Sequence, residues 1–300
     1  MSVRAIKSKI GSVKNIKKIT KAMEMVSVSK MQKAVAATLR TREYAHRALE
    51  VLAHVSHNRF LRFPLLHVGA GDKELVVVVA SNKGLCGGFN ASIRKRLRDL
   101  AKKTNAPLEV IAIGRYAEIA ARGVGLRVAA SFIDLPEEVH VTDIHAITSL
   151  IRNEFEEGDY KHVYMLYTTY KSALVQRPKV RTLLPITEEV VHDVLDEVVH
   201  MEDDAGEPQA EPRSLALYMF EPGEIDVAET IIPRLVEMVL YQAILESRAS
   251  EHSARMIAMK NATDNAKSLV DTLTLRYNKL RQASITQEIA EISSAAEALG

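Results

Sequence analysis

The stretch IKSKIGSVKNIKKITKAMEMV, residues 6–26, decides the fold class. Its apolar residues recur in steps of three or four, with lysines in most of the gaps, and they are Ile6, Ile10, Val13, Ile16, Ile19, Met23 and Val26. This spacing predicts an amphipathic helix, and no proline interrupts the pattern from the first residue to about residue 58. Such a helix extends roughly 85 Å at about 1.5 Å per residue, so a compact domain alone cannot cover its apolar stripe.

A second helical pattern, from about residue 224 to residue 297, supplies a partner of matching length. No proline or glycine follows Pro233 until Gly300. The predicted seam of this helix keeps the same steps through Leu235, Val239, Gln242, Leu245, Ala249, His252, Met256, Met259, Thr263, Ala266, Leu269, Leu273, Tyr277 and Leu280. Two long terminal helices around an inserted domain predict an antiparallel coiled coil. Because isolated helices are marginal in water, each helix should depend on the other for its order.

Strand and helix patterns alternate between the two terminal helices. The run ELVVVVA, residues 74–80, is typical of a strand buried on both faces in a parallel sheet. Further strands are expected at 108–113, 162–170, 180–184 and 215–220, and helices at 90–103, 116–122 and 141–157. The alternation predicts a small Rossmann-like α/β domain inserted into the coiled coil. We therefore expect a coiled-coil helix over 1–60, an α/β foot domain over 61–221 and a second coiled-coil helix over 222–300.

The net charge of +2, from 40 basic and 38 acidic residues, is the sum over segments of opposite charge, one strongly basic and one strongly acidic. Residues 1–50 carry 12 Lys and Arg against 3 acidic residues, whereas residues 186–212 carry 10 acidic residues and no Lys or Arg. The acidic stretch is expected to be a solvated linker within the foot domain. A single cysteine, Cys86, excludes an intramolecular disulfide. No apolar run approaches the roughly 20 residues of a membrane span, so we expect a soluble protein without direct membrane insertion.

The glycine loop at residues 81–90 is the first candidate for a chemical site. It joins a buried strand to a helix, where backbone N–H groups often bind phosphate. It has neither a Walker A sequence nor a Gly-x-Gly-x-x-Gly fingerprint, and its glycines equally suit a tight turn. Cys86 within it is expected to be a small buried side chain. The ten histidines show no metal-ligand spacing and no triad motif is present, so the sequence predicts no catalytic residue, cofactor or metal.

The basic character of the first helix has three interpretations. Its lysines could be the solvated flank of a coiled coil, a nucleic-acid-binding surface, or a surface for an acidic protein. A solvated flank usually mixes both signs of charge, but here nearly all the charges are positive, at Lys7, Lys9, Lys14, Lys17, Lys18 and Lys21. The lysines are interleaved with the apolar stripe instead of forming a separate block. That arrangement favours a surrounding protein sleeve over nucleic acid.

Four motifs resemble those of one protein family. They are ITKAMEMV at 19–26 with SKM at 29–31, GLCGG at 84–88, ARMIAMKNATDNA at 254–266 and YNKLRQASITQEI at 277–289. In this order they are similar to the gamma subunit of F-type ATP synthase, and the resemblance covers essentially the whole chain. The acidic stretch near residues 190–213 departs from the family pattern, and the middle domain matches it more loosely.

The resemblance implies a function, partners and a location. The chain is expected to be a non-catalytic central rotor, which couples ion flow through a membrane ring to ATP synthesis or hydrolysis at the beta subunits. Its partners would be three alpha and three beta subunits, an epsilon subunit and the membrane c-ring, at the cytoplasmic face of a bacterial membrane as a peripheral protein. A basic coiled-coil nucleic-acid-binding protein is the alternative.

The resemblance also implies contact residues. Beta-subunit contacts are expected at Lys17, Lys18, Lys21, Met23, Arg255, Arg281, Gln282 and Thr286. Contacts with the membrane ring or epsilon are expected at Tyr218, Phe220 and Glu221. Met23 could equally be a methionine of the coiled-coil seam. Small and apolar residues at the end of the chain suit a bearing that turns past equivalent subunits, and they are Ala283, Ile285, Ile289, Ala290, Ala295 and Ala296.

Overall fold

The computed structural model describes residues 2–56, 63–186 and 223–297 of the chain. Helix α1 (Val3–Ser56) and helix α6 (Glu224–Glu297) confirm the two long terminal helices. The chain divides into two compact units, one of residues 1–28 with 255–300 and the other of residues 29–254. Each unit is considered by itself. The expected strand at 215–220 and nearly all of the acidic stretch at 186–212 lie outside the described residues.

The unit of residues 29–254 contains a five-stranded sheet of order β3-β2-β1-β4-β5. The strands are β1 (Lys73–Val79), β2 (Leu108–Ile113), β3 (Arg127–Phe132), β4 (Tyr160–Tyr170) and β5 (Gln176–Leu184). The first four run parallel, and β5 pairs antiparallel with β4. Sequence reasoning missed β3. This edge strand alternates exposed and half-buried residues, so it has no apolar run to reveal it.

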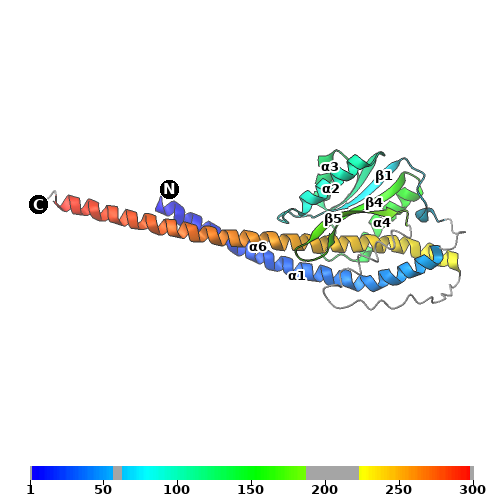
Figure 1. Ribbon diagram of the computed structural model, residues 1–300, viewed down its shortest axis with the longest axis horizontal. Helices are drawn as coiled ribbons and strands as arrows, with labels where there is room; N and C mark the ends of the chain where they lie inside the picture. Colours follow the sequence, from blue (N-terminus) through cyan, green and yellow to red (C-terminus); the bar gives the residue numbers. More distant parts are fainter. Residues whose placement is uncertain (1, 57–62, 187–222, 298–300) are drawn as a thin grey trace. The chain divides into compact units, whose positions relative to one another are not determined.

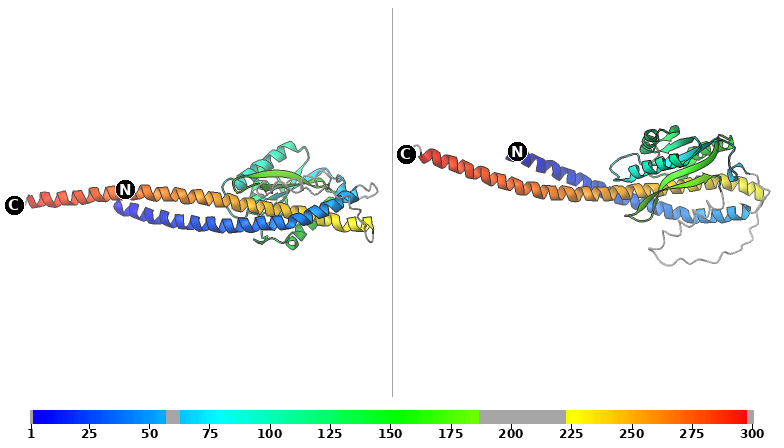
Figure 2. Two further views of the ribbon diagram at one scale, coloured as in Figure 1. Left: turned by 60° about the horizontal axis from the view of Figure 1, so that its bottom comes forward. Right: turned by 45° about the horizontal axis from the view of Figure 1, so that its top comes forward.

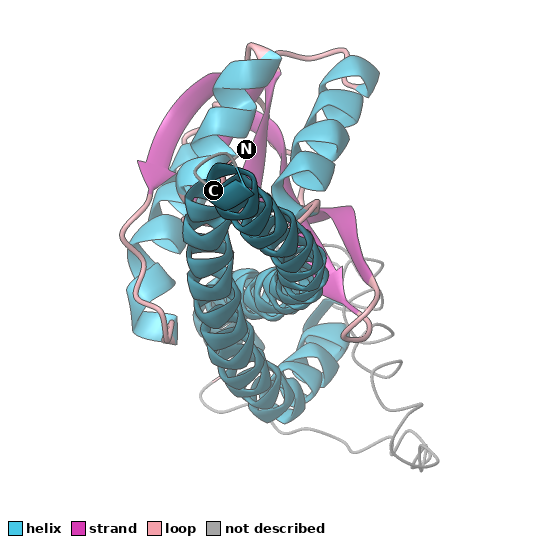
Figure 3. Cartoon of the chain, turned by 90° about the vertical axis from the view of Figure 1, so that its left-hand side faces the viewer, coloured by secondary structure: helices cyan, strands magenta, loops and turns pink. Residues whose placement is uncertain are grey.

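Helices cover both faces of the sheet (Figures 1 and 3). On one face Val76 and Val78 pack with α2 (Phe89–Lys103) and α3 (Arg115–Val124). On the other face Leu75 and Val77 pack with α4 (Val141–Glu156), with the short 3-10 helix η1 (Pro64–Leu66) and with residues 232–245 of α6. Strand β1 is therefore buried from both sides, as its valine run predicts.

The unit of residues 1–28 with 255–300 is a helix pair (Figure 2). Its seam follows a seven-residue repeat, because Ile6, Val13, Thr20 and Ser27 of α1 are all buried. The same repeat runs along α6 through the buried residues Met259, Ala266 and Leu273. Ile6, Val13, Ala266 and Leu273 form one apolar cluster, which confirms the predicted coiled coil. Among the described residues, no helix combines the length and apolar character that a membrane span requires.

Part of the predicted α1 stripe is not in this seam. Ile16, Ile19 and Val26 are 52%, 60% and 53% exposed, so their assignment to the seam was wrong. The predicted stripe advances 20 positions, from Ile6 to Val26, in six steps, whereas a seam advances 3.5 residues per step. The two patterns separate after Val13, and the seam passes through Thr20 and Ser27 instead. Leu269 of α6 was misassigned in the same way and is 43% exposed.

Candidate partner-binding surfaces

The apolar residues that leave the seam form an exposed patch on α1. We call Ile16, Ile19 and Val26, which lie on one side of the helix, the α1 strip, and all three are more than half exposed. Lys18, next to Ile19 in the sequence, is exposed and makes no ion pair with any described part of the chain. Soluble proteins seldom leave several large apolar side chains exposed in succession along a helix unless another molecule covers them. The α1 strip therefore has the composition of an interface with an acidic rim on its partner.

The predicted contact residues of α1 lie around this strip. Lys18 is exposed and Lys17 is half-buried. Lys21 is exposed, and its Nζ lies 2.9 Å from Oε1 of Glu24 in an i,i+3 ion pair. Met23 is half-buried, so it is neither fully covered nor fully available to a partner. These positions leave both interpretations of Met23 open.

The end of α6 presents a second surface, which we call the α6 tip (residues 281–294). In both views of Figure 2 this end of α6 continues past the start of α1. Arg281, Gln282 and Thr286 are exposed, and the hydroxyl of Thr286 donates to the carbonyl oxygen of Gln282 at 2.9 Å. The side chains of Arg281 and Gln282 make no hydrogen bond or ion pair within the described chain. Their donors are therefore free for a partner.

Apolar residues of the α6 tip are also exposed. Ile285, Ile289 and Ile292 are 47%, 61% and 70% exposed, and their spacing of four and three places them on one face of the helix. The side chains of Ala295 and Ala296 lie outside the description. The tip thus combines free hydrogen-bond donors with an apolar ridge that nothing in the described chain covers.

The remaining predicted contacts are one buried residue and three residues outside the description. Arg255 is only 8% exposed, so its side chain offers little surface to another protein. Tyr218, Phe220 and Glu221 lie outside the described residues. Sequence reasoning found Arg255 by its motif, but the motif carries no information on how far the side chain is buried.

Inside the helix pair, one polar contact joins the two helices. The Oγ1 atoms of Thr20 and Thr263 are 2.8 Å apart, and both residues are buried. The Thr263 hydroxyl also lies 2.8 Å from the carbonyl oxygen of Met259, and the Thr20 hydroxyl lies 3.1 Å from that of Lys17. A polar pair in one layer of an apolar seam favours a single register, because slipped registers leave both hydroxyl groups facing apolar side chains.

In the unit of residues 29–254, two glutamates before α4 bind the long helices. Oε1 of Glu137 lies 2.8 Å from Nζ of Lys30 on α1 and 3.3 Å from Nε2 of His252 on α6. Oε1 of Glu138 lies 2.7 Å from Nζ of Lys33 on α1. The sheet domain is thus tied to both long helices by charge as well as by its core. None of these contacts was predicted from sequence, because the paired residues are more than 100 positions apart.

These ion pairs lower the pKa of both glutamates. Burial raises the pKa of Glu137, but the hydrogen bond and charge of Lys30, with His252 and Arg248, outweigh it and the net pKa is lowered. The hydrogen bond to Lys33 lowers the pKa of Glu138, and the same contact raises the pKa of Lys33. Both carboxylates therefore stay ionised through the neutral pH range.

The glycine loop at residues 81–90 is filled by its own side chains. Cys86 is 2% exposed, which confirms the small buried side chain expected there. Nδ2 of Asn90 lies 2.7 Å from Oγ of Ser81 and 3.2 Å from Sγ of Cys86. Gly114 packs so closely on Ala80 that a Cβ would meet its carbonyl oxygen, which explains a glycine after β2. Within the described residues no three His, Cys, Asp or Glu side chains form a group that could hold a metal.

Comparison with known proteins identifies similar chains. The family described as ATP synthase matches residues 2–299. The ATP synthase gamma chain of Pelotomaculum thermopropionicum is 37% identical over 299 residues, which is 99% of each chain. That of Roseiflexus castenholzii is 40% identical over 306 aligned positions, covering 99% of this chain and 98% of the relative. These comparisons give no support to the nucleic-acid alternative.

Solved structures share the fold. A chain of the Euglena gracilis mitochondrial ATP synthase, in a structure of its OSCP, F1 and c-ring, aligns with a TM-score of 0.66 and 20% identity. The alignment covers 99% of this chain and 94% of that one. A chain of the central stalk and c-ring structure from Tetrahymena thermophila aligns with a TM-score of 0.58 and 24% identity, over 81% of this chain and 99% of that one. Long terminal helices with an inserted α/β domain are therefore a known architecture.

Proposed function

This chain belongs to the ATP synthase gamma-chain family, and from that membership we propose that it is the central rotor of a bacterial ATP synthase. Ion flow through a membrane ring would turn it, and its rotation would drive ATP synthesis or hydrolysis in neighbouring subunits. The observation that carries the proposal is the combination of a heptad-paired shaft with exposed apolar and basic residues on the outside of its two helices. A shaft needs internal cohesion and a separate outer surface for its bearing.

Two features of the helix pair suit torque transmission. The apolar cluster of Ile6, Val13, Ala266 and Leu273 holds α1 against α6, so that twisting one helix must displace the other. The Thr20–Thr263 contact opposes sliding of the helices along each other. A paired shaft therefore resists twisting and slipping better than one helix would.

The α1 strip and the α6 tip are proposed to meet the alpha and beta subunits, three of each. Apolar contact with Ile16 and Ile19 would supply affinity without fixed bonds, which suits a surface that must move past equivalent subunits. The positive charges of Lys18 and Lys21 would attract acidic surfaces of the surrounding alpha and beta subunits, and this attraction weakens as the salt concentration rises. Arg281 and Gln282 would donate to carboxylate or carbonyl oxygens there.

The foot domain is proposed to connect the shaft to the membrane ring and to an epsilon subunit. The ion pairs of Glu137 with Lys30 and His252, together with the α6 residues in the sheet core, give the foot a firm attachment to the long helices. Tyr218, Phe220 and Glu221 are proposed contacts with these partners on the family resemblance. The protein would be peripheral, at the cytoplasmic face of the membrane.

The chain itself is proposed to be non-catalytic. The glycine loop at residues 81–90 lacks the Walker A residues, and the side chains of Ser81, Cys86 and Asn90 bond to one another inside it. ATP chemistry would occur on other subunits. This subunit would contribute asymmetry and motion, not reacting groups.

Reconstitution with alpha and beta subunits tests the function. The complex is expected to require this chain for rapid ATP hydrolysis, and a fully active complex that excludes the chain would refute the rotor assignment. Arg281→Ala with Gln282→Ala should weaken assembly or slow turnover by roughly tenfold or more, because charge-assisted hydrogen bonds contribute about 1.5–3 kcal/mol each. Lys267→Ala with Ser268→Ala, two exposed neighbours on the paired part of α6, is the matched control and should have a much smaller effect.

A further inference from the structure

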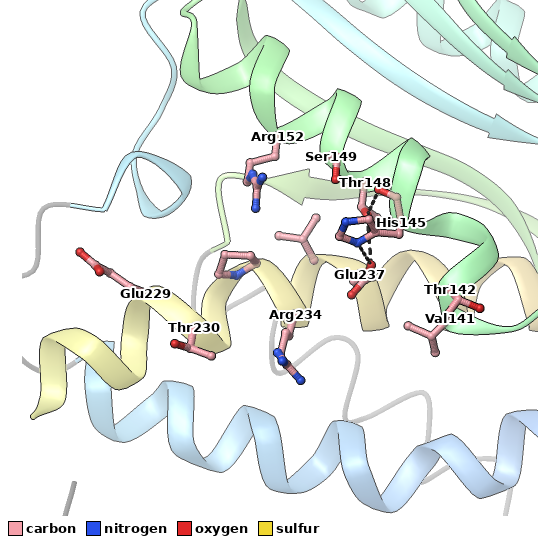
Figure 4. A pocket seen from close by; sticks show the side chains of 12 residues that line it. Val141, Thr142, His145, Thr148, Ser149, Arg152, Glu229, Thr230, Arg234 and Glu237 are labelled. Carbon is pink, nitrogen blue, oxygen red and sulfur yellow. Dashed lines mark hydrogen bonds and ion pairs between the residues drawn. The ribbon is translucent and has the colours of Figure 1, made fainter. Parts of the chain in front are cut away.

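A cavity of about 570 Å³ lies between α4 and the first turns of α6, in the unit of residues 29–254 (Figure 4). It shares no residue with the α1 strip or the α6 tip. Its volume is in the range of small-molecule sites, about 300–1,000 Å³. One face of α4 supplies Ser149 and Arg152, and α6 supplies Pro233, Val236 and Glu237. The rotor function gives no role to this cavity.

Arg152 is the least satisfied charged group in the cavity wall. Its side chain is half-buried, extends toward α6 in Figure 4, and makes no hydrogen bond or ion pair with the described part of the chain. A guanidinium that has lost part of its hydration without gaining an anion is unfavourable. Ser149 lies three residues before it on the same face of α4, is half-buried and likewise has no hydrogen-bond partner there. A guanidinium with a hydroxyl beside it matches the two oxygens of a carboxylate.

The α6 wall sets the charge of the ligand. Oε1 of Glu237 lies 2.9 Å from Nδ1 of His145 and accepts from the Thr148 hydroxyl at 3.5 Å, so this carboxylate is held in the wall. Glu229 adds a second carboxylate to the lining. With Arg152 and Arg234 the lining carries two guanidinium groups against these two carboxylates, so it has no excess positive charge to hold a dianion such as phosphate. The wall therefore selects a single negative charge.

The rest of the wall is suited to an apolar body. Val236 is 1% exposed and Pro233 is half-buried, and both line the cavity beside Val141 at the start of α4. Pro233 has no N–H, so the carbonyl oxygen of Glu229, four residues earlier, lacks its usual helical donor.

We propose that this cavity binds a small organic monocarboxylate, with Arg152 and Ser149 holding the carboxylate and Pro233 and Val141 contacting its apolar body. Because the ligand contacts α4 and α6 together, its binding stabilises the attachment of the foot domain to the long helix. This inference does not depend on the rotor function, since binding is a property of the folded chain.

Calorimetric titration and thermal unfolding of the full chain test the proposal, with butyrate, benzoate, succinate and inorganic phosphate as probes. Butyrate or benzoate should bind saturably and raise the Tm, and succinate and phosphate should bind more weakly. Arg152→Gln should weaken benzoate binding by about tenfold or more, as expected for a charge-assisted contact. Ser149→Ala should weaken it by a smaller factor. Arg94→Gln, at an exposed and equally unpaired arginine of α2, is the matched control and should change nothing.

Several results would overturn the proposal. The proposed site is refuted if neither butyrate nor benzoate binds saturably. It is also refuted if the Arg152→Gln variant and the Arg94→Gln control bind benzoate with equal affinity. Tighter binding of succinate or phosphate refutes the selection for one charge. The titration is then repeated on the assembled ATP synthase complex. If the assembled complex still binds the monocarboxylate, a free metabolite is supported as the ligand. If the complex no longer binds it, a free metabolite is refuted, and the site is assigned to an acidic side chain of a neighbouring subunit.

Discussion

The buried threonine pair of the shaft gives a quantitative test of the coiled-coil seam. Thr263→Val removes the hydroxyl that lies 2.8 Å from that of Thr20 while keeping the shape of the side chain. The Thr20 hydroxyl can still donate to the carbonyl oxygen of Lys17 at 3.1 Å, so no buried donor is stranded. The expected cost is therefore that of one net hydrogen bond, about 0.5–1.5 kcal/mol.

The reciprocal variant, Thr20→Val, removes the other hydroxyl of the same hydrogen bond. In Thr20→Val, the Thr263 hydroxyl can turn to the carbonyl oxygen of Met259 at 2.8 Å, and the cost is again about 0.5–1.5 kcal/mol. Both single variants lose the same bond, so the double variant should cost about as much as one of them. The coupling free energy should accordingly be about 0.5–1.5 kcal/mol.

Urea unfolding of the full chain and its three variants measures this cycle. Thr274→Val is the control, because the Thr274 hydroxyl is exposed and bonds only within its own helix, to the carbonyl oxygen of Val270. Thr20→Val combined with Thr274→Val should be additive. If Thr20→Val and Thr263→Val are also additive to within about 0.3 kcal/mol, the two hydroxyl groups do not interact and the seam assigned here is incorrect.

Three further predictions concern the sheet domain. Glu109→Ala should lower the free energy of unfolding by about 1–3 kcal/mol, because it leaves the buried Tyr160 hydroxyl without its 2.9 Å acceptor; an unchanged urea midpoint would contradict this. Ile147→Ala, at a fully buried α4 position, should cost about 2–5 kcal/mol and lower the Tm, whereas a Tm within a degree of wild type would mean that the site is not close-packed. Burial and the charge of Glu74 raise the pKa of Tyr164 from 10.0 to about 12. The stability from this group is therefore complete below pH 10 and lost as pH rises from 10 toward 12, so Tyr164→Phe should flatten the alkaline fall in Tm, and an identical fall would refute the assignment.

The elements of the fold were largely predictable because each has a strong local signal. The valine run of β1 predicted a strand buried on both faces, and the absence of proline and glycine after Pro233 predicted a long C-terminal helix. β3 escaped because an edge strand half in solvent needs no apolar run. The best signal for β3 was Gly125. Its left-handed conformation ends α3, and β3 begins two residues later.

The candidate surfaces were only partly predictable. The motifs located Arg281, Gln282 and Thr286, and all three are exposed. Periodicity could not distinguish the apolar residues that face the partner helix from those that face solvent, since both sets recur every three or four residues. Arg152 and the cavity around it could not be found at all, because α4 and α6 meet there from positions about 80 residues apart.

The sequence by itself determined that two long helices enclose an α/β domain, because helix and strand periods, glycine and proline placement and local charge are properties of neighbouring residues. Only the tertiary structure decided which residues of α1 are covered. Ile16 and Ile19 carry the same apolar signal as Ile6 and Val13, yet only the second pair is buried. The reason is geometric: two helices that wind around each other bury positions 3.5 residues apart, and that choice exists only once the partner helix is in place.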